Sequence, residues 1–195
     1  MTGREPVETT NLDRYDNPAL AWARADQALG AEMPRPAVPS FLGTVRPDGR
    51  PSAAGVGAVW RDGELYFTSS PKARKARNLA ANPACTFSVR LQGIDVVIEG
   101  EAARVTDAAT LKSIAAVYHG AGWPAEVEGD AFTAPFNAPS AGPPPWHLYR
   151  MRVSTVFGVA TAEPYGATRW RFEDWVRGLG SGSTGGARDA GTRWA

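Results

Sequence analysis

Short apolar segments separated by tight-turn sequences run through most of this chain, and this spacing limits the folds that it can adopt. The turn sequences are rich in Gly, Asp and Pro: Pro47-Asp48-Gly49, Asp62-Gly63, Gln92-Gly93 and Tyr165-Gly166. The segments around them are expected to be strands: 41–46, 51–60, 64–69, 84–91, 94–105, 148–161 and 168–172. Turns this short join antiparallel strands, whereas parallel strands need a long crossover. The spacing therefore predicts an antiparallel sheet.

Helical patterns interrupt the strands at three places. Residues 18–29 and 71–81 are expected to form short helices, and the second ends at Asn82-Pro83 because proline disfavours helix in the residue before it. Asp107 is a good N-cap for a third helix, whose apolar residues recur at helical spacing. The apolar run 96–98 suggests a strand buried on both faces. Together these elements predict an α+β, mostly β fold with a barrel or a strongly curved sheet.

Changes in composition divide the chain into three parts. Residues 1–39 are expected to be a polar N-terminal arm, mobile at its start, with a short helix. Residues 40–175 are expected to be one domain, and 176–195 a disordered Gly/Ser-rich tail. The stretch 120–147 is long for an ordinary connection and holds several aromatic and Pro residues. It is therefore predicted to be a lid or a dimer-interface segment.

The strand that ends at Ser69 leads directly into a basic helix. Ser70 suits the N-cap of that helix and Pro71 its first position, which would put Lys72, Arg74 and Lys75 in the first turn. A helix N-terminus already carries free N–H groups and a positive dipole, so these cations oppose its stability unless an anion is bound. A phosphate or carboxylate site is the hypothesis, and an ordinary solvated polar face is the alternative.

The cationic signal is local, because 21 Lys and Arg residues face 20 Asp and Glu residues, for a net charge of +1. Neither nucleic-acid binding nor membrane attachment is therefore expected. Cys85 is the only cysteine, and His119 and His147 lack metal-ligand spacing to a partner, so no disulfide and no metal site are expected. Because no signal sequence or long apolar run is found, the expected location is the cytoplasm.

Several of these features occur together in one known superfamily. The Thr68-Ser69 turn, the Arg74-Lys75 pair, Asn78-Leu79 and Asn82-Pro83 resemble the phosphate-binding segment of the flavin-binding split-barrel proteins, whose best-known member is pyridoxamine 5′-phosphate oxidase. The resemblance covers roughly residues 40 to 172 and is greatest to the F420- or FMN-dependent reductases of the group. It implies an FMN-binding split barrel, antiparallel and Greek-key-like, that forms a homodimer with each cofactor in a groove between the subunits.

The resemblance also implies which residues hold the cofactor, F420 or FMN, at its phosphate and along its ring system. These are Val56, Ala58, Trp60, Thr68, Ser69, Lys72, Arg74, Lys75, Asn78, Arg169 and Trp170. One departure is Ala73, because the superfamily often has Ser immediately before the Arg-Lys pair. Arg74 and Lys75 are the residues that match the motif directly. For Trp170, a place in the core is the alternative.

Small residues around Gly55 and Gly57 suggest room for a flat substrate above the cofactor ring, and a bulge at a barrel corner is the alternative. Trp123, from the long loop, is expected in the same substrate pocket. A pyridoxamine phosphate oxidase holds its substrate with a C-terminal Arg-x-His, where this chain has Arg169-Trp170-Arg171. That difference argues against vitamin B6 chemistry.

The implied function is an oxidoreductase that transfers a hydride to or from a small, flat, unsaturated substrate, with the cofactor supplying the chemistry. No catalytic residue is assigned, and His147 is only a hypothetical proton donor. Two alternatives remain open. One is a non-catalytic protein that binds or sequesters a flavin, a deazaflavin or haem, with His119 or His147 as axial ligand of the haem. The other is an FMN-dependent oxidase of the pyridoxamine phosphate type.

Overall fold

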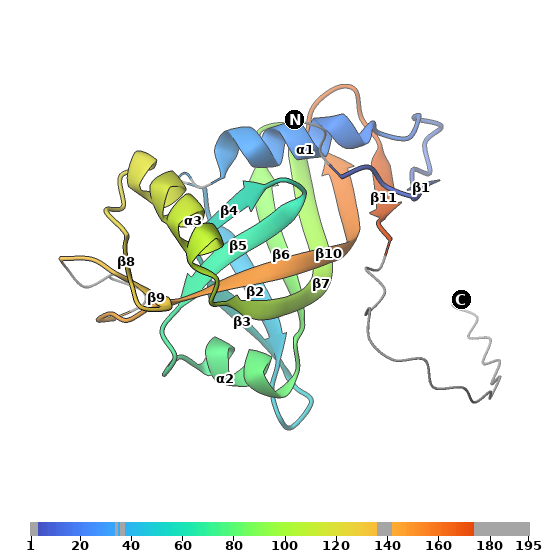
Figure 1. Cartoon of the computed structure of the whole chain (residues 1–195). Helices are drawn as coiled ribbons and strands as arrows, with labels where there is room; N and C mark the ends of the chain where they lie inside the picture. The colour runs from blue at the N-terminus through green and yellow to red at the C-terminus, as the bar shows by residue number, and fades with distance from the viewer. Residues whose placement is uncertain (1–3, 34, 36–37, 136–141, 174–195) are drawn as a thin grey trace, which may run out of the picture.

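The structure, a computed structural model, describes residues 4–33, 35, 38–135 and 142–173. Most of its strands belong to one antiparallel sheet with helices around it (Figure 1). The strands are β1 (Glu8–Asn11), β2 (Ser40–Val45), β3 (Pro51–Gly55), β4 (Ala58–Arg61), β5 (Glu64–Ser69), β6 (Ala84–Leu91), β7 (Ile94–Val105), β8 (Glu126–Glu128), β9 (Ala131–Thr133), β10 (His147–Ala160) and β11 (Ala167–Arg171). The helices are α1 (Trp22–Glu32), α2 (Arg74–Ala81) and α3 (Ala108–Gly120).

The sheet curls into a barrel because one long strand, β10, is shared between two neighbours. The order is β1-β11-β10-β7-β6-β2-β3, and β5, which carries β4 on its other side, also pairs with β10. The first part of β10 pairs with β5 and the last part with β11, and a bulge lies between Val153 and Thr155. Beside the bulge, Gly100 is required because a Cβ there would overlap the carbonyl oxygen of Arg152. The predicted α+β, mostly β barrel is confirmed.

Alternate residues of the strands fill the barrel. In β6, Cys85, Phe87 and Val89 are buried, and the residues between them face outward. Strand β7 alternates in the same way, so Val97, predicted to be buried, is 39% exposed on the outer face. That prediction is wrong because three consecutive β-branched residues also fit an alternating strand whose outward residue happens to be apolar.

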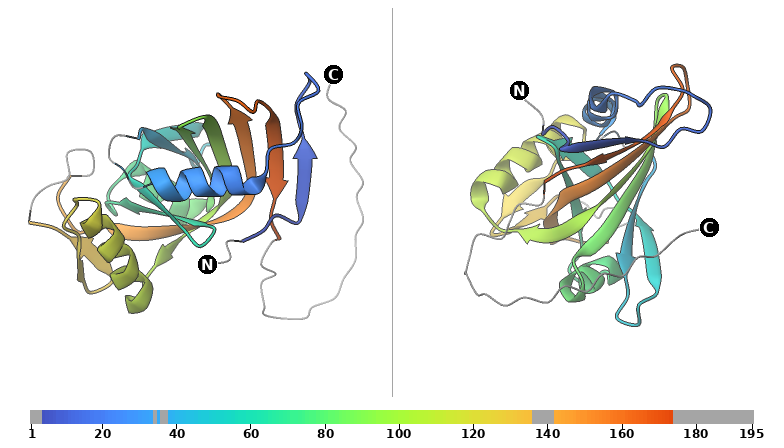
Figure 2. Two further views of the ribbon diagram at one scale, coloured as in Figure 1. Left: turned by 90° about the horizontal axis from the view of Figure 1, so that it is seen from above. Right: turned by 90° about the vertical axis from the view of Figure 1, so that its right-hand side faces the viewer.

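The helices cover different parts of the barrel. Helix α1 runs across one end of the strands, and α2 lies at the opposite end (Figures 1 and 2). Trp22 of α1 packs edge-on against Trp170, at 5.4 Å between ring centroids, and against Phe172, at 4.9 Å. Helix α3 packs outside β4 and β5, over a second apolar cluster that includes Val59 and Tyr66. The strands β4 and β5 are therefore buried on both faces.

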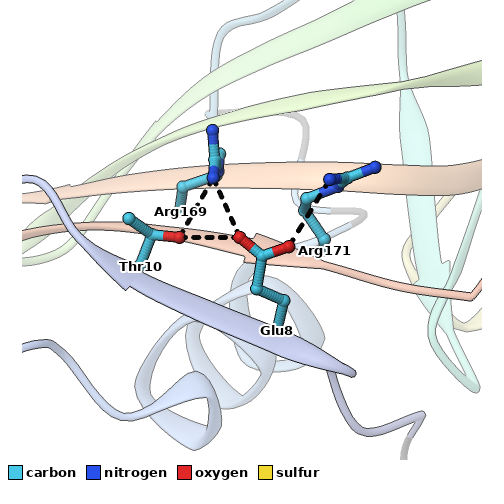
Figure 3. Close-up of polar contacts among 4 residues, drawn as sticks. All are labelled: Glu8, Thr10, Arg169 and Arg171. Atoms are coloured by element: carbon cyan, nitrogen blue, oxygen red, sulfur yellow. Dashed lines mark hydrogen bonds and ion pairs between the residues drawn. The ribbon is translucent and has the colours of Figure 1, made fainter.

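Part of the N-terminal arm forms the edge of the sheet. Strand β1 pairs with β11, and Glu8 makes ion pairs with Arg169, at 3.0 Å, and Arg171, at 3.4 Å (Figure 3). Arg4 donates a hydrogen bond to the carbonyl of Val153, at 2.9 Å. The prediction of a mobile start is wrong for this stretch, because strand addition satisfies the backbone groups of polar residues without any apolar periodicity.

Other element boundaries also differ from those predicted. The expected strand 51–60 is two strands, interrupted at Val56 and Gly57, and the first helix spans Trp22–Glu32 rather than 18–29. The long stretch 120–147 contains the β8–β9 hairpin, and its residues 136–141 lie outside the described residues. The predicted tail, 176–195, lies outside them as well. In the described ranges, no helix is long and apolar enough to cross a membrane.

Candidate functional site

Helix α2 begins at Arg74 and has no side chain to cap it. Its N-cap is Ala73, so the backbone N–H groups of the first turn lack a side-chain acceptor. The predicted cap, Ser70, instead closes the preceding turn: its side-chain oxygen accepts from Lys72 N at 3.3 Å, and its carbonyl accepts from Ala73 N at 3.0 Å. The helix therefore starts three residues later than predicted, and its positive end is open to an anion.

Four cations surround this open helix end. Lys72, Arg74 and Arg77 are exposed and Lys75 is half-buried. None of the four makes an ion pair with any residue that the structure describes. Burial lowers the pKa of Lys75, which means that its ammonium group is held in a partly desolvated place without a counter-charge. An anion at this position would relieve both conditions.

The strand break at Val56 and Gly57 lies beside the segment that leads into this turn. The β4–β5 pairing ends at Ala58 opposite Phe67, and Gly57 and Thr68 are the next residues of the two segments. Ser40 holds the break from the other side. Its carbonyl accepts from Val56 N at 3.2 Å, and its hydroxyl donates to Val56 O at 2.8 Å. The structure thus brings together the two groups of residues that were predicted to face the ring and the phosphate.

The strand break leaves open space where the substrate pocket was predicted. Gly55 and Gly57 are both exposed. A Cβ built on Gly57 would meet no heavy atom within 4 Å, and one built on Gly55 would meet only the Ser40 carbonyl oxygen, at 4.0 Å. Neither glycine is needed for close packing within the described chain. The room beside them is available to a ligand or to another chain.

Trp123 does not line this space directly. It is half-buried in the second apolar cluster, edge-on to Tyr118, at 4.9 Å, and to Trp146, at 5.4 Å. Its neighbour Tyr118 does reach the strand break, because the Tyr118 hydroxyl donates to the Gly57 carbonyl at 3.2 Å. Helical spacing identified Tyr118 only as a core residue, and no sequence signal connects it to a glycine 61 positions away.

Several of the other predicted site residues have side chains that make contacts within the fold. Asn78 is 2% exposed and donates to the Thr44 hydroxyl at 2.9 Å, so it fastens α2 to β2 rather than facing a ligand. Ala58, Trp60 and Trp170 lie in the barrel core. Arg169 is bound by Glu8 and Thr10 of β1 (Figure 3). The structure therefore shows contacts within the fold for these five side chains, and their predicted role in cofactor binding stays a prediction.

His147 and Ser69 are neighbours on paired strands. Ser69 is fully buried, and its hydroxyl donates to the Ser70 carbonyl at 3.2 Å. Partial burial lowers the pKa of His147, and the nearby positive charge of Arg104 lowers it further. The imidazole is therefore neutral at pH 7. Ser69 contributes to the shape of the turn, and Thr68, half-buried, is the more accessible hydroxyl.

The outer face of the sheet is a second feature, distinct from the basic turn. A concavity of about 1150 Å³ lies over β2, β6, β7 and β10, lined by charges of both signs such as Glu101 and Arg152. No residue of the turn or of α2 lines it. Further along the same face, β2, β6 and β7 place Phe41, which is 51% exposed, in one row with Ser88 and Val97. This face combines exposed apolar residues with a broad hollow.

Comparison with known proteins gives a consistent result. The chain matches the sequence model of the pyridoxamine 5′-phosphate oxidase family over residues 32–160. No relative was found among curated proteins. A solved pyridoxamine 5′-phosphate oxidase-related, FMN-binding protein from Nostoc punctiforme is 19% identical, with a TM-score of 0.54, over 80% of this chain and 93% of that one.

Two further solved structures are similar to this chain. A heme binding protein from Mycobacterium smegmatis is 17% identical, with a TM-score of 0.52, over 77% of this chain and 58% of that one. An F420 reductase is 25% identical, with a TM-score of 0.45, over 65% of this chain and 93% of that one. The family match spans more than half of the sequence. This chain therefore belongs to the pyridoxamine 5′-phosphate oxidase family.

Proposed function

We propose that the protein is an oxidoreductase that binds the phosphate of F420 or FMN at the start of α2. The observation that carries this proposal is the uncapped end of α2, surrounded by four cations that make no ion pair within the described residues. A phosphate supplies both missing partners: acceptors for the free N–H groups and negative charge for the side chains. Membership of the family supports a cofactor of the flavin type.

In this proposal the first turn of α2 and its cations hold the phosphate. Lys75 approaches from a partly buried position, Arg74 and Lys72 from the exposed rim, and Thr68 offers a hydroxyl. The Val56-Gly57 segment lies against the ring system, where the absence of side chains at Gly55 and Gly57 leaves space for a flat substrate. Gly57 and Thr68 directly follow the last β4–β5 pair, Ala58 and Phe67, and this proximity supports the arrangement because one ligand can span two adjacent segments.

A bound cofactor of this type supplies hydride transfer. The chain's own residues orient the ligand and limit the access of water to it. The neutral imidazole of His147 is beside the buried Ser69, and no catalytic role is assigned to it. A small, flat, unsaturated molecule remains the proposed substrate class, because the open space beside the glycines suits a planar ligand.

The proposed assembly is a homodimer through the outer face of the sheet. Phe41 of β2 and Val97 of β7 are exposed apolar residues in one row across the sheet, on either side of Ser88 of β6, and such rows are usually covered in assemblies. A second subunit bound to this face would form one side of the candidate site near Gly55, because Gly55 pairs with Phe41. Light scattering should give twice the mass of the 20.7 kDa chain. A single-chain mass at micromolar concentration contradicts the dimer.

Binding measurements separate this function from the alternatives. The full-length chain is titrated with FMN, F420, riboflavin and haem, and fluorescence quenching or absorbance reports binding. We expect FMN or F420 to bind more tightly than riboflavin, which lacks the phosphate. If neither FMN nor F420 binds below about millimolar concentration, which corresponds to only ~4 kcal/mol, the proposed function is wrong.

A carrier protein would pass that binding test, so a second experiment is needed. The loaded protein is reduced and then mixed with flat enone, imine or quinone acceptors. Oxidation of the bound cofactor faster than that of the free cofactor supports an enzyme. Equal rates with all acceptors favour the non-catalytic binding protein, and tight binding of haem alone favours the haem-binding alternative.

A further inference from the structure

Tyr118 of helix α3 is a buried polar side chain that joins the two halves of the candidate site. It is 5% exposed, and its hydroxyl donates to the Gly57 carbonyl at 3.2 Å. Burial raises the pKa of Tyr118, and an interaction with the Thr68 side chain opposes that rise. The hydroxyl is therefore protonated at every physiological pH and lies between the strand break and the strand that leads into the basic turn.

The strand break depends on main-chain contacts of this kind. Gly57 has no side chain, and a Cβ built there would meet nothing within 4 Å, so packing does not hold it. Val56 is held on one side by the buried Ser40, through hydrogen bonds of 2.8 and 3.2 Å. On the other side, the described contact that holds Gly57 is the Tyr118 hydroxyl. Without this hydrogen bond the segment would be conformationally free, because Gly57 has no side chain whose packing could restrain the backbone.

The tyrosine itself is rigidly placed. Its ring packs edge-on against Trp123, at 4.9 Å, and against Phe132, at 6.2 Å. These rings belong to the second apolar cluster, to which α3 and the β8–β9 hairpin contribute together with β4, β5 and β10. A hydroxyl fixed by such packing is pre-organised, so it holds its partner without losing further side-chain freedom.

We propose that Tyr118 is a positioning residue that sets the distance between the Val56-Gly57 segment and the Thr68 strand end, and so determines whether one ligand can contact both. This inference rests on the proposed function, in which the ring lies at the first segment and the phosphate at the turn that follows the second. Tyr118 touches neither part of the ligand. Tyr118 affects how much more tightly a phosphate-bearing ligand binds than the same ligand without its phosphate.

The test is the variant Tyr118→Phe, which removes the hydroxyl and keeps the aromatic packing. Dissociation constants are measured for FMN and for riboflavin, or for F420 and its phosphate-free deazaflavin. We expect the phosphate-bearing ligand to bind about tenfold more weakly, because the Gly57 carbonyl loses its donor and the segment is loosened. The phosphate-free ligand uses only one segment, so its affinity should change less than about threefold.

Two further variants provide the controls. Tyr149→Phe removes the hydroxyl of a second buried tyrosine, whose ring is stacked against Phe67 at 5.4 Å. This hydroxyl makes no hydrogen bond with the described residues, so the variant should leave both affinities unchanged. Ser40→Ala loosens the same break from the opposite side, without touching α3, and should reproduce the selective loss. It also keeps the inference testable if Tyr118→Phe does not fold.

The outcomes are distinguishable. A selective loss of the phosphate-dependent gain in Tyr118→Phe and Ser40→Ala, with none in Tyr149→Phe, supports the positioning role. A lower melting temperature with an unchanged ratio of the two affinities overturns it and leaves the proposed function intact. Wild-type protein that binds neither FMN nor F420 overturns the proposed function, and the positioning role with it.

Discussion

Helices α2 and α3 begin in opposite ways, although both follow a strand of the same barrel. At α3, the Asp107 side chain accepts from Thr110 N at 2.8 Å, which satisfies the helix end with a negative charge. At α2, the N-cap is Ala73, no side chain accepts, and the first turn carries cations. One helix end is capped within the chain, and the other has no side-chain cap, which leaves its N–H groups free for the phosphate of the proposed function.

The largest expected effect is at the cations of α2. In the double variant Arg74→Gln/Lys75→Gln, the affinity for FMN or F420 should fall by at least about 100-fold, because two charged hydrogen-bond donors are lost at ~1.5–3 kcal/mol each. The same variant should melt at a higher temperature without ligand, because burial lowers the pKa of Lys75 and the charged ammonium is therefore unfavourable in the free protein. Fluorescence titration and thermal melts measure the two effects.

Lys112 gives a matched control for that variant. It is an exposed lysine on α3, and Lys112→Gln makes the same kind of substitution, with the loss of one positive charge, away from the candidate site. Its affinity should equal that of the wild type. If the double variant and Lys112→Gln bind the cofactor with equal affinity, the open end of α2 has no role in binding. The contrast drawn between the starts of α2 and α3 would then have no functional meaning.

The next largest effect concerns the attachment of α2 to the barrel. Asn78→Ala leaves the buried Thr44 hydroxyl without its donor and should lower the free energy of unfolding by about 2 kcal/mol. Urea unfolding measures this change. Arg77→Ala, at the exposed neighbouring position, should change stability by less than about 0.5 kcal/mol. If the two variants are equally stable, Asn78 does not fasten the helix.

A smaller effect is expected when α2 is given a cap of its own. Ala73→Ser supplies an N-cap oxygen and should raise the free energy of unfolding of the ligand-free protein by about 1 kcal/mol. With saturating FMN or F420 the gain should be smaller, because a bound phosphate already accepts from the same N–H groups. Melts with and without ligand compare the two gains, and an equal gain in both states would place the phosphate elsewhere.

The smallest effect is at the cap of α3. The hydrogen bond from the Thr110 backbone N–H lowers the pKa of Asp107 below its ordinary value. A lowered folded pKa stabilises the protein above the ordinary value, near ~3.9, and this stabilisation is lost as the pH falls through the folded pKa. Asp107→Ala should therefore melt a few degrees lower at pH 7 and differ less from wild type near pH 3. Ligand affinity should not change.

The segments that could be predicted from the sequence are those specified by neighbouring residues. The strand at 84–91, the turn at Asp62-Gly63 and the cap at Asp107 depend on residues a few positions apart, and the structure confirms them. Asp62 and Gly63 both have positive φ, 54° and 76°, as the two-residue hairpin turn requires. The clustered cations and the glycine pair were likewise visible as local composition.

The buried face of α2 could not be predicted in the same way. At a helical spacing of residues 71–81, Asn78 falls beside the cations and Ala80 beside Ala73, Ala76 and Leu79, which would make Ala80 the packed residue; in the structure Asn78 is buried and Ala80 is exposed. A helix of small residues offers no strong apolar stripe, so contact with Thr44 of β2 decides its orientation. The addition of β1 to β11 depends on residues more than 150 positions apart, which no local pattern encodes.

The sequence by itself determined that this chain forms an antiparallel barrel with a cationic helix after a Ser-rich turn, because periodicity, turn residues and charge clustering act over short distances. Only the tertiary structure decided that Asn78, Trp60 and Trp170 serve the fold, that Ala73 leaves the helix end open, and that Tyr118 reaches Gly57. These outcomes depend on contacts between distant segments, and such contacts exist only once the barrel has closed around its core.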